Sequence, residues 1–174
     1  TVTVSYKGFT DTFEVEVTNN IVGMIIKSKP NKTIYIKGEE LDLDGGILEV
    51  TYEDGSKSEV EMTNEEVKVT GYNKEQLGTQ KIVLEYKGFT ETFAVEVTNN
   101  IVGIELIVPN KLIYVKGEEL DLTGAKLEVR YQDGSKEEVE ITAEMVTGYD
   151  KDILGKQTVT VSYKGFTDTF EVEV

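Results

Sequence analysis

The sequence predicts an all-β protein made of tandem β-sandwich repeats, and three observations lead to this prediction. Residues 98–174 copy residues 18–97. Inside each copy, apolar and polar residues alternate with a period of two, which is typical of half-buried strands. Turn signals containing glycine separate the alternating stretches, and none has the period of a helix three turns long. About seven short strands per repeat would bury their apolar faces by packing as two sheets.

Internal repetition defines the expected domain organisation. Residues 18–23 return as 98–103, residues 37–43 as 116–122, and residues 70–72 as 147–149, at offsets of 80, 79 and 77. Relative to the first copy, the second therefore lacks one residue before Pro109 and two more between Thr142 and Val146. Such deletions are typical of loops, which tolerate changes in length. We expect one repeat at 18–97 and a second at 98–174.

The opening segment Thr1–Val17 reads TVTVSYKGFTDTFEVEV, letter for letter the same as Thr158–Val174. We interpret residues 1–17 as the C-terminal hairpin of a truncated preceding repeat. A lone hairpin is marginal in water, and its apolar face would lie open. We expect it either to be disordered or to dock on another chain, which would give head-to-tail self-association through residues 1–17.

The first third of each repeat holds a β-like stretch that a proline interrupts. In the second repeat Ile101–Val108 precedes Pro109, and Leu112–Val115 follows it; Pro30 holds the same place in the first repeat. Because proline donates no ladder hydrogen bond, we expect one strand that breaks there and switches sheets.

The middle and last thirds of each repeat predict two hairpins. Asp54-Gly55 and Asp133-Gly134 supply the first turn, and Lys164-Gly165 supplies the closing turn in the second repeat, because glycine accepts positive φ. Threonine, valine and aromatic residues suit the flanking strands. The residues expected to be buried are Leu48, Val50, Val60, Leu84, Phe93, Val95, Leu127, Val129, Val139, Val161, Phe170 and Val172.

Three stretches carry a resemblance to a known family: Tyr114–Leu122, Leu127–Ser135, and Gly155–Gly165 followed by Thr169–Val174. They resemble the bacterial Ig-like repeats of group 3, over essentially the whole chain. The resemblance implies tandem immunoglobulin-like β-sandwiches in an extracellular setting, on a cell surface or in a secreted protein. It also implies a spacer or contact module, as found in adhesins and beside carbohydrate-active enzymes, with no general catalytic motif.

Composition narrows the function classes. The chain has 33 acidic and 18 basic residues and a net charge of −15, so phosphate backbones and anionic membrane surfaces would be repelled. There is no cysteine and no histidine, which removes thiolate nucleophiles, typical zinc sites and the usual acid–base residue near neutral pH. We therefore expect no nucleic-acid or membrane partner and no cofactor.

Adjacent carboxylates such as Glu39-Glu40 and Glu118-Glu119 recur in both repeats. Neighbouring strand residues point to opposite faces, so such pairs do not converge as the two carboxyls of a glycosidase must. We expect no catalytic residues. A weak metal candidate is Asp42 with Asp44, although the second copy has Thr123 in place of the second aspartate and a calcium site needs more oxygens.

Tyr35 and Tyr114 are the weak candidates for binding residues. Each sits in a strand between aliphatic residues, and if the aliphatics face inward the tyrosine rings face solvent, where they could stack on a sugar or a partner. Packing on the sheet surface is the plainer alternative.

Two functions remain open at the level of sequence. One is a structural spacer, since only Thr98-Asn99-Asn100 link the repeats and flexible linkers need more length. The other is a repeated binding module for a glycan or a protein on a surface. In both cases the first partners are the neighbouring repeats of the same chain.

Overall fold

The computed structural model describes all residues from 1 to 174 and contains fifteen strands and one short 3₁₀ turn, Ala143–Met145. It has no helix long and apolar enough to span a membrane. Two compact units are present, and the first consists of Thr1–Tyr35, Glu40–Asn73 and Gly78–Glu96. The second consists of Ile36–Glu39, Lys74–Leu77 and Val97–Val174.

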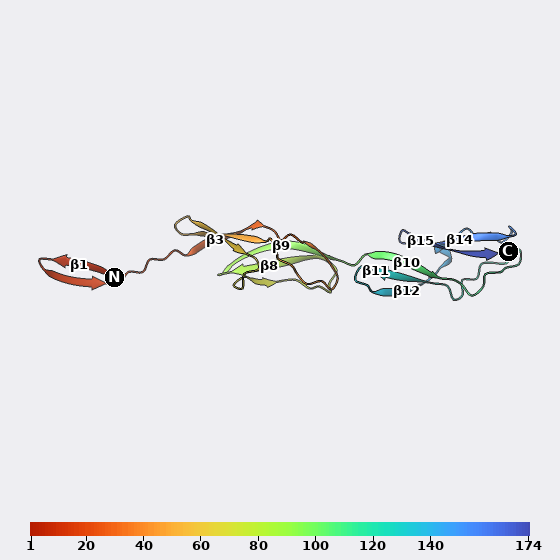
Figure 1. Cartoon of the computed structure of the whole chain (residues 1–174), viewed down its shortest axis with the longest axis horizontal. Helices are drawn as coiled ribbons and strands as arrows, with labels where there is room; N and C mark the ends of the chain where they lie inside the picture. The colour runs from red at the N-terminus through yellow and green to blue at the C-terminus, as the bar shows by residue number, and fades with distance from the viewer. The chain divides into compact units, whose positions relative to one another are not determined.

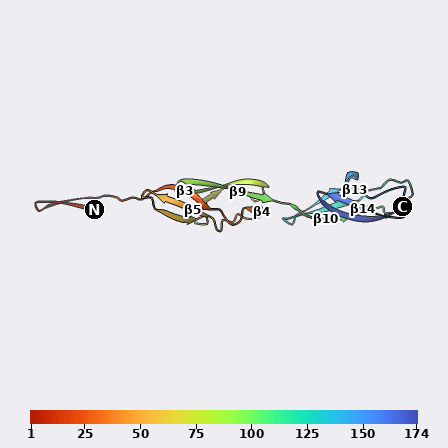
Figure 2. The same ribbon diagram turned by 90° about the horizontal axis from the view of Figure 1, so that it is seen from above.

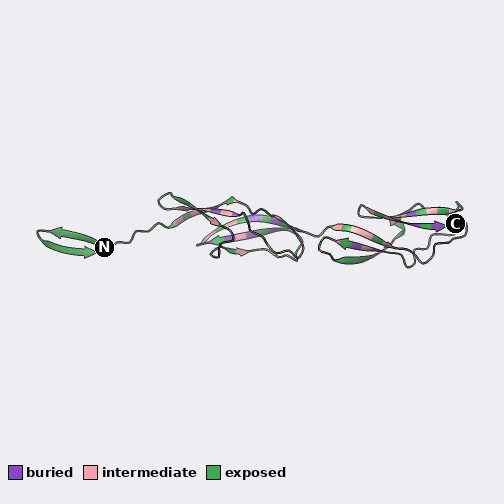
Figure 3. Cartoon of the chain, viewed as in Figure 1, coloured by how far each residue is buried: buried purple, intermediate pink, exposed green.

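The N-terminal segment forms a two-stranded hairpin of β1 (Val2–Tyr6) and β2 (Phe9–Phe13), which pair only with each other. Every residue from 1 to 20 is exposed (Figure 3).

The first repeat is a β-sandwich of two sheets (Figure 1). One sheet has the order β3 (Ile21–Ser28), β5 (Ile47–Tyr52) and β6 (Lys57–Glu61). The other has the order β4 (Ile34–Ile36), β9 (Phe89–Thr98), β8 (Gly78–Tyr86) and β7 (Lys68–Thr70).

The second repeat also has two sheets, seen from a second side in Figure 2. Their orders are β10 (Ile101–Ile107), β11 (Lys126–Tyr131), β12 (Lys136–Glu140), and β13 (Val146–Thr147), β14 (Lys156–Tyr163), β15 (Phe166–Glu173). Ile113 adds a single parallel bridge to Glu173 of β15. The prediction of tandem immunoglobulin-like sandwiches is confirmed.

The strand break at the proline is also confirmed. Before Pro30, β3 belongs to the sheet with β5; after it, β4 lies beside β9 in the other sheet. In the second repeat β10 pairs with β11, whereas Ile113 bridges to β15. The switch lets one stretch of chain join both layers of its sandwich.

Each repeat has its own apolar core between its two sheets. Ten of the twelve residues predicted to be buried are buried, including Leu48, Leu127 and Phe170. Val60 and Val139 are only half-buried, because they lie on β6 and β12 at the edges of their sheets. A Leu or Val side chain buried in full contributes about 1.5–3 kcal/mol relative to an exposed one.

A glycine at the same position in both repeats allows two neighbouring strands to approach closely. Gly71 and Gly148 have φ of 96° and 92°, and an added Cβ would lie 2.2 and 2.5 Å from the carbonyl oxygens of Lys81 and Thr158. Only glycine allows this close approach of β7 or β13 to its neighbour.

Gln80 and Gln157 have a matching role. Each side-chain oxygen accepts a backbone N–H, and each amide donates to a backbone carbonyl, at 2.7 Å, on Asn73 in the first repeat and on Asp150 in the second. These side-chain hydrogen bonds take the place of backbone ladder hydrogen bonds where the loop leaves the sheet.

Candidate functional site

Tyr35 and Tyr114, the candidate binding residues, do not face solvent. Tyr35 is 1% exposed and Tyr114 is 4% exposed. The aliphatic residues beside them point outward instead: Ile34 is 60% exposed and Ile113 is 72% exposed. The expectation of exposed rings is wrong, because the alternation of the strand has the opposite phase.

A hydrogen-bonded pocket explains why a tyrosine occupies each buried position. The Tyr35 hydroxyl lies 2.8 Å from the Asp42 carbonyl oxygen and 3.0 Å from that of Lys32, and it accepts the Asp42 N–H at 3.2 Å. Tyr114 makes the same contacts with Lys111 and Asp121, at 2.9 to 3.2 Å. A buried hydroxyl with these partners costs little to desolvate, and it anchors the loop that follows.

The Asp42 carboxylate supports a turn. Its Oδ1 accepts the N–H of Asp44 at 2.9 Å, and Asp121 accepts the N–H of Thr123 at the same distance. Hydrogen bonds from Thr123 hold the pKa of Asp121 below its usual value. Asp42 and Asp44 are both exposed, and no group of three or more His, Cys, Asp or Glu side chains in the chain could hold a metal ion.

The adjacent glutamates have separate partners. Glu118 accepts the Val115 N–H at 3.0 Å and pairs with Lys111, while Glu119 pairs with Lys151. The hydrogen bond from Lys111, followed by that from Val115, lowers the pKa of Glu118. The two carboxylates therefore do not act on a common point, and the lowered pKa of Glu118 is the opposite of what a general acid needs.

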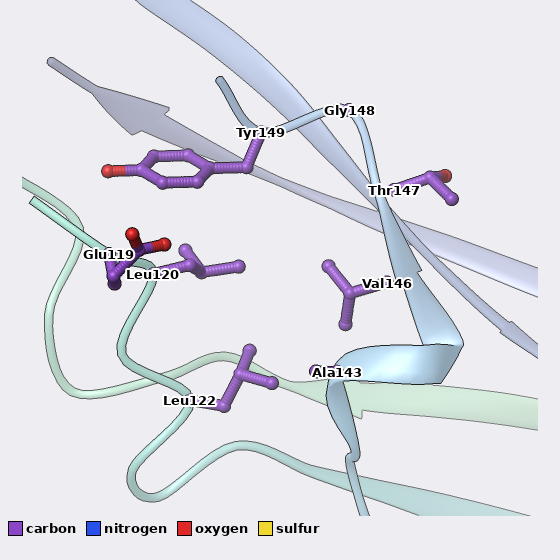
Figure 4. Close-up of a pocket in the computed structure, with 8 residues that line it drawn as sticks. All are labelled: Glu119, Leu120, Leu122, Ala143, Val146, Thr147, Gly148 and Tyr149. Atoms are coloured by element: carbon purple, nitrogen blue, oxygen red, sulfur yellow. The ribbon is translucent and has the colours of Figure 1, made fainter. Parts of the chain in front are cut away.

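One hollow in the second repeat is a pocket of about 230 Å³. Leu120, Leu122 and Val146 converge on it, with the Tyr149 ring and Glu119 at one side (Figure 4). Ala143, Thr147 and Gly148 complete the lining. It can hold a small apolar group beside one carboxylate.

This pocket lies where the second repeat is two residues shorter than the first. In the longer segment Thr63–Val69 of the first repeat, Val67 is buried. The Tyr149 hydroxyl donates to the Glu118 carbonyl at 2.6 Å, and burial raises the pKa of Tyr149. Tyr149 thus stabilises the loop that contains Glu118, and its ring packs against that of Tyr114 with the ring centroids 5.3 Å apart.

A second, shallower hollow occurs at the same place in both repeats, beside the strand that carries the buried tyrosine. Its volume is about 240 Å³ in the first repeat and about 180 Å³ in the second. The lining residues of the first are Thr33, Ile34, Thr79, Ala94, Val95 and Glu96. The corresponding residues of the second are Leu112, Ile113, Lys156, Glu171, Val172 and Glu173. The hollow therefore has the same position in both repeats, but different polar side chains line it.

Sequence reasoning missed the asparagines that precede the first strand of each repeat. The Asn99 amide donates to the Asp133 carboxylate at 2.9 Å, and its oxygen accepts the Asp133 N–H at 3.1 Å. Asn100 exchanges backbone hydrogen bonds with Gln132, its N–H on the side-chain oxygen and its carbonyl on the Gln132 N–H, both at 3.0 Å. The retained triplet Thr-Asn-Asn was the available signal.

The first repeat repeats this arrangement with its own hairpin. Asn19 accepts the N–H of Asp54 at 3.2 Å, and Asn20 contacts Glu53 through both backbone groups and its side chain. Hydrogen bonds from Ser56, with a smaller one from Asn19, lower the pKa of Asp54. In both repeats the residues before the first strand are therefore bound to the Asp-Gly hairpin that follows them.

Two curated proteins are similar to the chain. Pectate lyase L of Thermoclostridium stercorarium is 31% identical over 163 residues, which cover 87% of this chain and 13% of that protein. Exo-beta-1,6-galactobiohydrolase of Bifidobacterium longum subsp. longum is 29% identical over 153 residues, 83% of this chain and 10% of that protein. The chain thus spans only a small part of the length of either relative.

Two solved structures also match. A solution structure of a protein described as a surface protein has 32% sequence identity and a TM-score of 0.31, over 47% of this chain and 91% of that one. Domains 4–9 of surface layer protein SbsC have 15% identity and a TM-score of 0.33, over 99% of this chain and 34% of that one.

The family comparison confirms the resemblance given by the motifs. The model of the bacterial Ig-like domain (group 3) matches residues 28–97 and again residues 107–174, which together make up most of the chain. The two matches end at Val97 and Val174, where β9 and β15 close their sandwiches. The chain therefore belongs to the bacterial Ig-like domain family, group 3, in two tandem copies.

Proposed function

We propose that these repeats are spacer modules of an extracellular bacterial protein, on the cell surface or secreted, and that they carry no catalytic activity of their own. The family and the relatives support this setting, since the repeats match 13% and 10% of proteins named as a pectate lyase and a galactobiohydrolase. On this proposal, catalysis in such proteins belongs to their other parts, and the repeats hold those parts at a distance.

The proposal rests on the hydrogen bonds that hold the residues just before the first strand of each repeat. Only Asn99 and Asn100 separate β9 from β10, and both are hydrogen-bonded to the hairpin at residues 132–133. Asn19 and Asn20 are bound in the same way to residues 53–54. A two-residue connection with its hydrogen bonds satisfied by the following repeat has few free torsions, as a spacer requires.

The retained residues also favour a spacer over a ligand site. Tyr35, Glu39 and Asp42, which recur in the second repeat as Tyr114, Glu118 and Asp121, all contact their own loop. The shared hollow, in contrast, changes Thr79 to Lys156. A binding module multiplied by repetition would keep the chemistry of its site.

The test is to release one connection. Asn99→Ala removes both side-chain hydrogen bonds to Asp133, and we expect the amide order parameters of residues 98–101 to fall from about 0.85 toward 0.6. Asn64→Ala is the matched control, because Asn64 caps an exposed turn on the Glu66 N–H at 2.9 Å. Order parameters already below about 0.6 in the parent would contradict the spacer proposal, and equal high values in the variant and the parent would show that the Asn99 side chain is not what restrains the connection.

The recurrence of a hollow in both repeats favours one second candidate, a binding module for a surface glycan or protein. Titration calorimetry with oligogalacturonate and with β-1,6-linked galacto-oligosaccharides separates the two functions. The spacer predicts no saturable heat at millimolar ligand. A saturable signal that Ile113→Asp abolishes would establish the binding module instead, since Ile113 lines the hollow and is largely exposed.

A further inference from the structure

Residues 1–17 and 158–174 fold into the same hairpin in two environments. Val2 is the Cα partner of Phe13, as Val159 is of Phe170, and Tyr6 is the partner of Phe9, as Tyr163 is of Phe166. The turn is the same as well, with φ of 46° and 86° at Lys7-Gly8 and of 45° and 88° at Lys164-Gly165. The N-terminal hairpin therefore already has the conformation that the second repeat buries.

The place that Thr158–Val174 fills, here called the closing slot, is made by the rest of the second repeat. Its polar contacts are almost all to the backbone: Tyr114 N–H donates to the Glu173 carbonyl at 2.8 Å, and Glu173 N–H donates to Leu112 at 2.9 Å. Val146 and Thr147 of β13 pair with Val161 and Thr160. Any segment with the same letters satisfies these contacts equally.

One side-chain contact adds selectivity to the closing slot. The Asp168 carboxylate accepts the Leu106 N–H from the opposite sheet at 3.0 Å. Residues 1–17 offer Asp11 at that position, whereas the first repeat has Glu91.

Size gives the same preference for the second repeat. The first repeat buries Ile82 and Leu84 where the second buries Val159 and Val161, and residues 1–17 carry valine at both positions. In the first repeat these valines would leave two methylene-sized voids, which are costly in a close-packed core. The hairpin thus fits the second repeat and not the first.

We propose that the closing slot accepts Thr1–Val17 of a second copy of this chain, joining copies head to tail. The apolar side chains that would be buried are now exposed: Val4 is 54% exposed and Phe13 is 52% exposed, against 0% for Val161 and 5% for Phe170. Because the slot and the hairpin lie on different parts of each copy, repeated exchange extends into an open chain of copies.

In the unaltered chain the exchange replaces one hairpin by an identical one, so it buries no additional surface. The tethered hairpin has the advantage of effective concentration, which for a short connection is in the millimolar range. Self-closure therefore dominates, and the exchange becomes visible when the two copies of the hairpin are made unequal.

Phe170→Ala makes them unequal, because Thr1–Val17 keeps Phe13. Truncating a buried phenylalanine usually weakens packing enough to favour the intact hairpin by about 150- to 5,000-fold. We expect concentration-dependent oligomers of Phe170→Ala in analytical ultracentrifugation. Phe13→Ala should sediment as the parent does, and Phe13→Ala combined with Phe170→Ala should not oligomerise.

Cross-linking distinguishes exchange from aggregation, and the chain has no cysteine to interfere. Thr147 is the Cα partner of Thr160, whose counterpart in the hairpin is Thr3. In the Phe170→Ala background, Thr3→Cys with Thr147→Cys should form disulfides between copies, giving a ladder of covalent multimers. Thr160→Cys with Thr147→Cys is the control and should form the bond within one chain.

Val161→Ala, with Val4 intact, repeats the test with a milder change should Phe170→Ala unfold the second repeat. Covalent ladders in either background support the proposal. Monomers at all concentrations, a Thr3→Cys/Thr147→Cys disulfide within one chain, or aggregates without the disulfide would overturn it.

Discussion

Thr1–Val17 and Thr158–Val174 have the same seventeen letters, and the structure gives them the same strand register and opposite burial. Phe170 and Val172 lie in the core of the second repeat, whereas Phe13 and Val15 are exposed. The hairpin conformation is thus specified locally, by the Lys-Gly turn and the alternation of apolar residues. Burial is supplied by the surrounding repeat.

The lengths of the strands differ between the two copies for the same reason. β15 continues to Glu173, but β2 ends at Phe13, four positions before Val17. In the second repeat the outer end of β15 is held by Leu112, Tyr114 and Gly155 through backbone hydrogen bonds of 2.8 to 3.0 Å. Where a strand ends is therefore decided by its partner and not by its own letters.

The sharpest test of this comparison is a pair of matched truncations. Phe170→Ala should lower the free energy of unfolding of the second repeat by about 3–5 kcal/mol, as loss of a buried aromatic side chain usually does. Phe13→Ala should leave the unfolding of both repeats unchanged. The measurement is urea unfolding followed by amide signals of β14 and of β8, at protein concentrations too low for association.

Two results would break the comparison. A loss under ~1 kcal/mol for Phe170→Ala would mean that the core tolerates a cavity there, against the usual cost. A loss of that size or more for Phe13→Ala would mean that the N-terminal hairpin packs on a repeat in solution.

Much of the fold could be predicted from the sequence because it depends on local signals. The period of two along Leu127–Tyr131, the Asp-Gly and Lys-Gly turns and the proline break are all present in the structure. Val60 and Val139 could not be placed, because an edge strand has the same alternation as a central one and differs only in its neighbours.

The candidate site was predicted less well. The strand Ile34–Ile36 has three residues suited to a core, so its alternation cannot say which face is inward; the hydrogen bonds of the Tyr35 hydroxyl decide it. The asparagines at 99 and 100 resemble ordinary linker residues until the hairpin at 132–133 is brought beside them. Both cases depend on contacts between distant residues, which one sequence does not reveal.

The Lys-Gly turn can be compared between the same two copies of the hairpin. Gly8 and Gly165 have φ near +87°, and neither has an atom within 4 Å of an added Cβ, so substitution there is strained only in the backbone. Gly165→Ala should cost the second repeat about 1–2 kcal/mol, the usual penalty for a left-handed residue with a side chain. Gly8→Ala should open β1–β2, seen as loss of cross-strand NOEs, without affecting either repeat. If Gly8→Ala and Gly165→Ala destabilised the repeats equally, the conclusion that the hairpin conformation is specified locally would be wrong.

The smallest expected difference concerns one carboxylate. Asp11 and Asp168 each accept the N–H of the following threonine at 2.8 Å, but only Asp168 also accepts the Leu106 N–H across the sandwich. Asp168→Ala should therefore cost about 1 kcal/mol of the unfolding free energy of the second repeat, the net value of a hydrogen bond whose donor is left partly buried. Asp11→Ala should cost nothing. Asp168→Asn, which retains an acceptor oxygen, should recover much of the loss, and hydrogen exchange at Leu106 should be faster in Asp168→Ala than in Asp168→Asn. If the two Asp168 variants exchange at the same rate, the carboxylate contacts only the next residue of its own strand, and the bond between the sheets contributes nothing to the difference between the two copies of the hairpin.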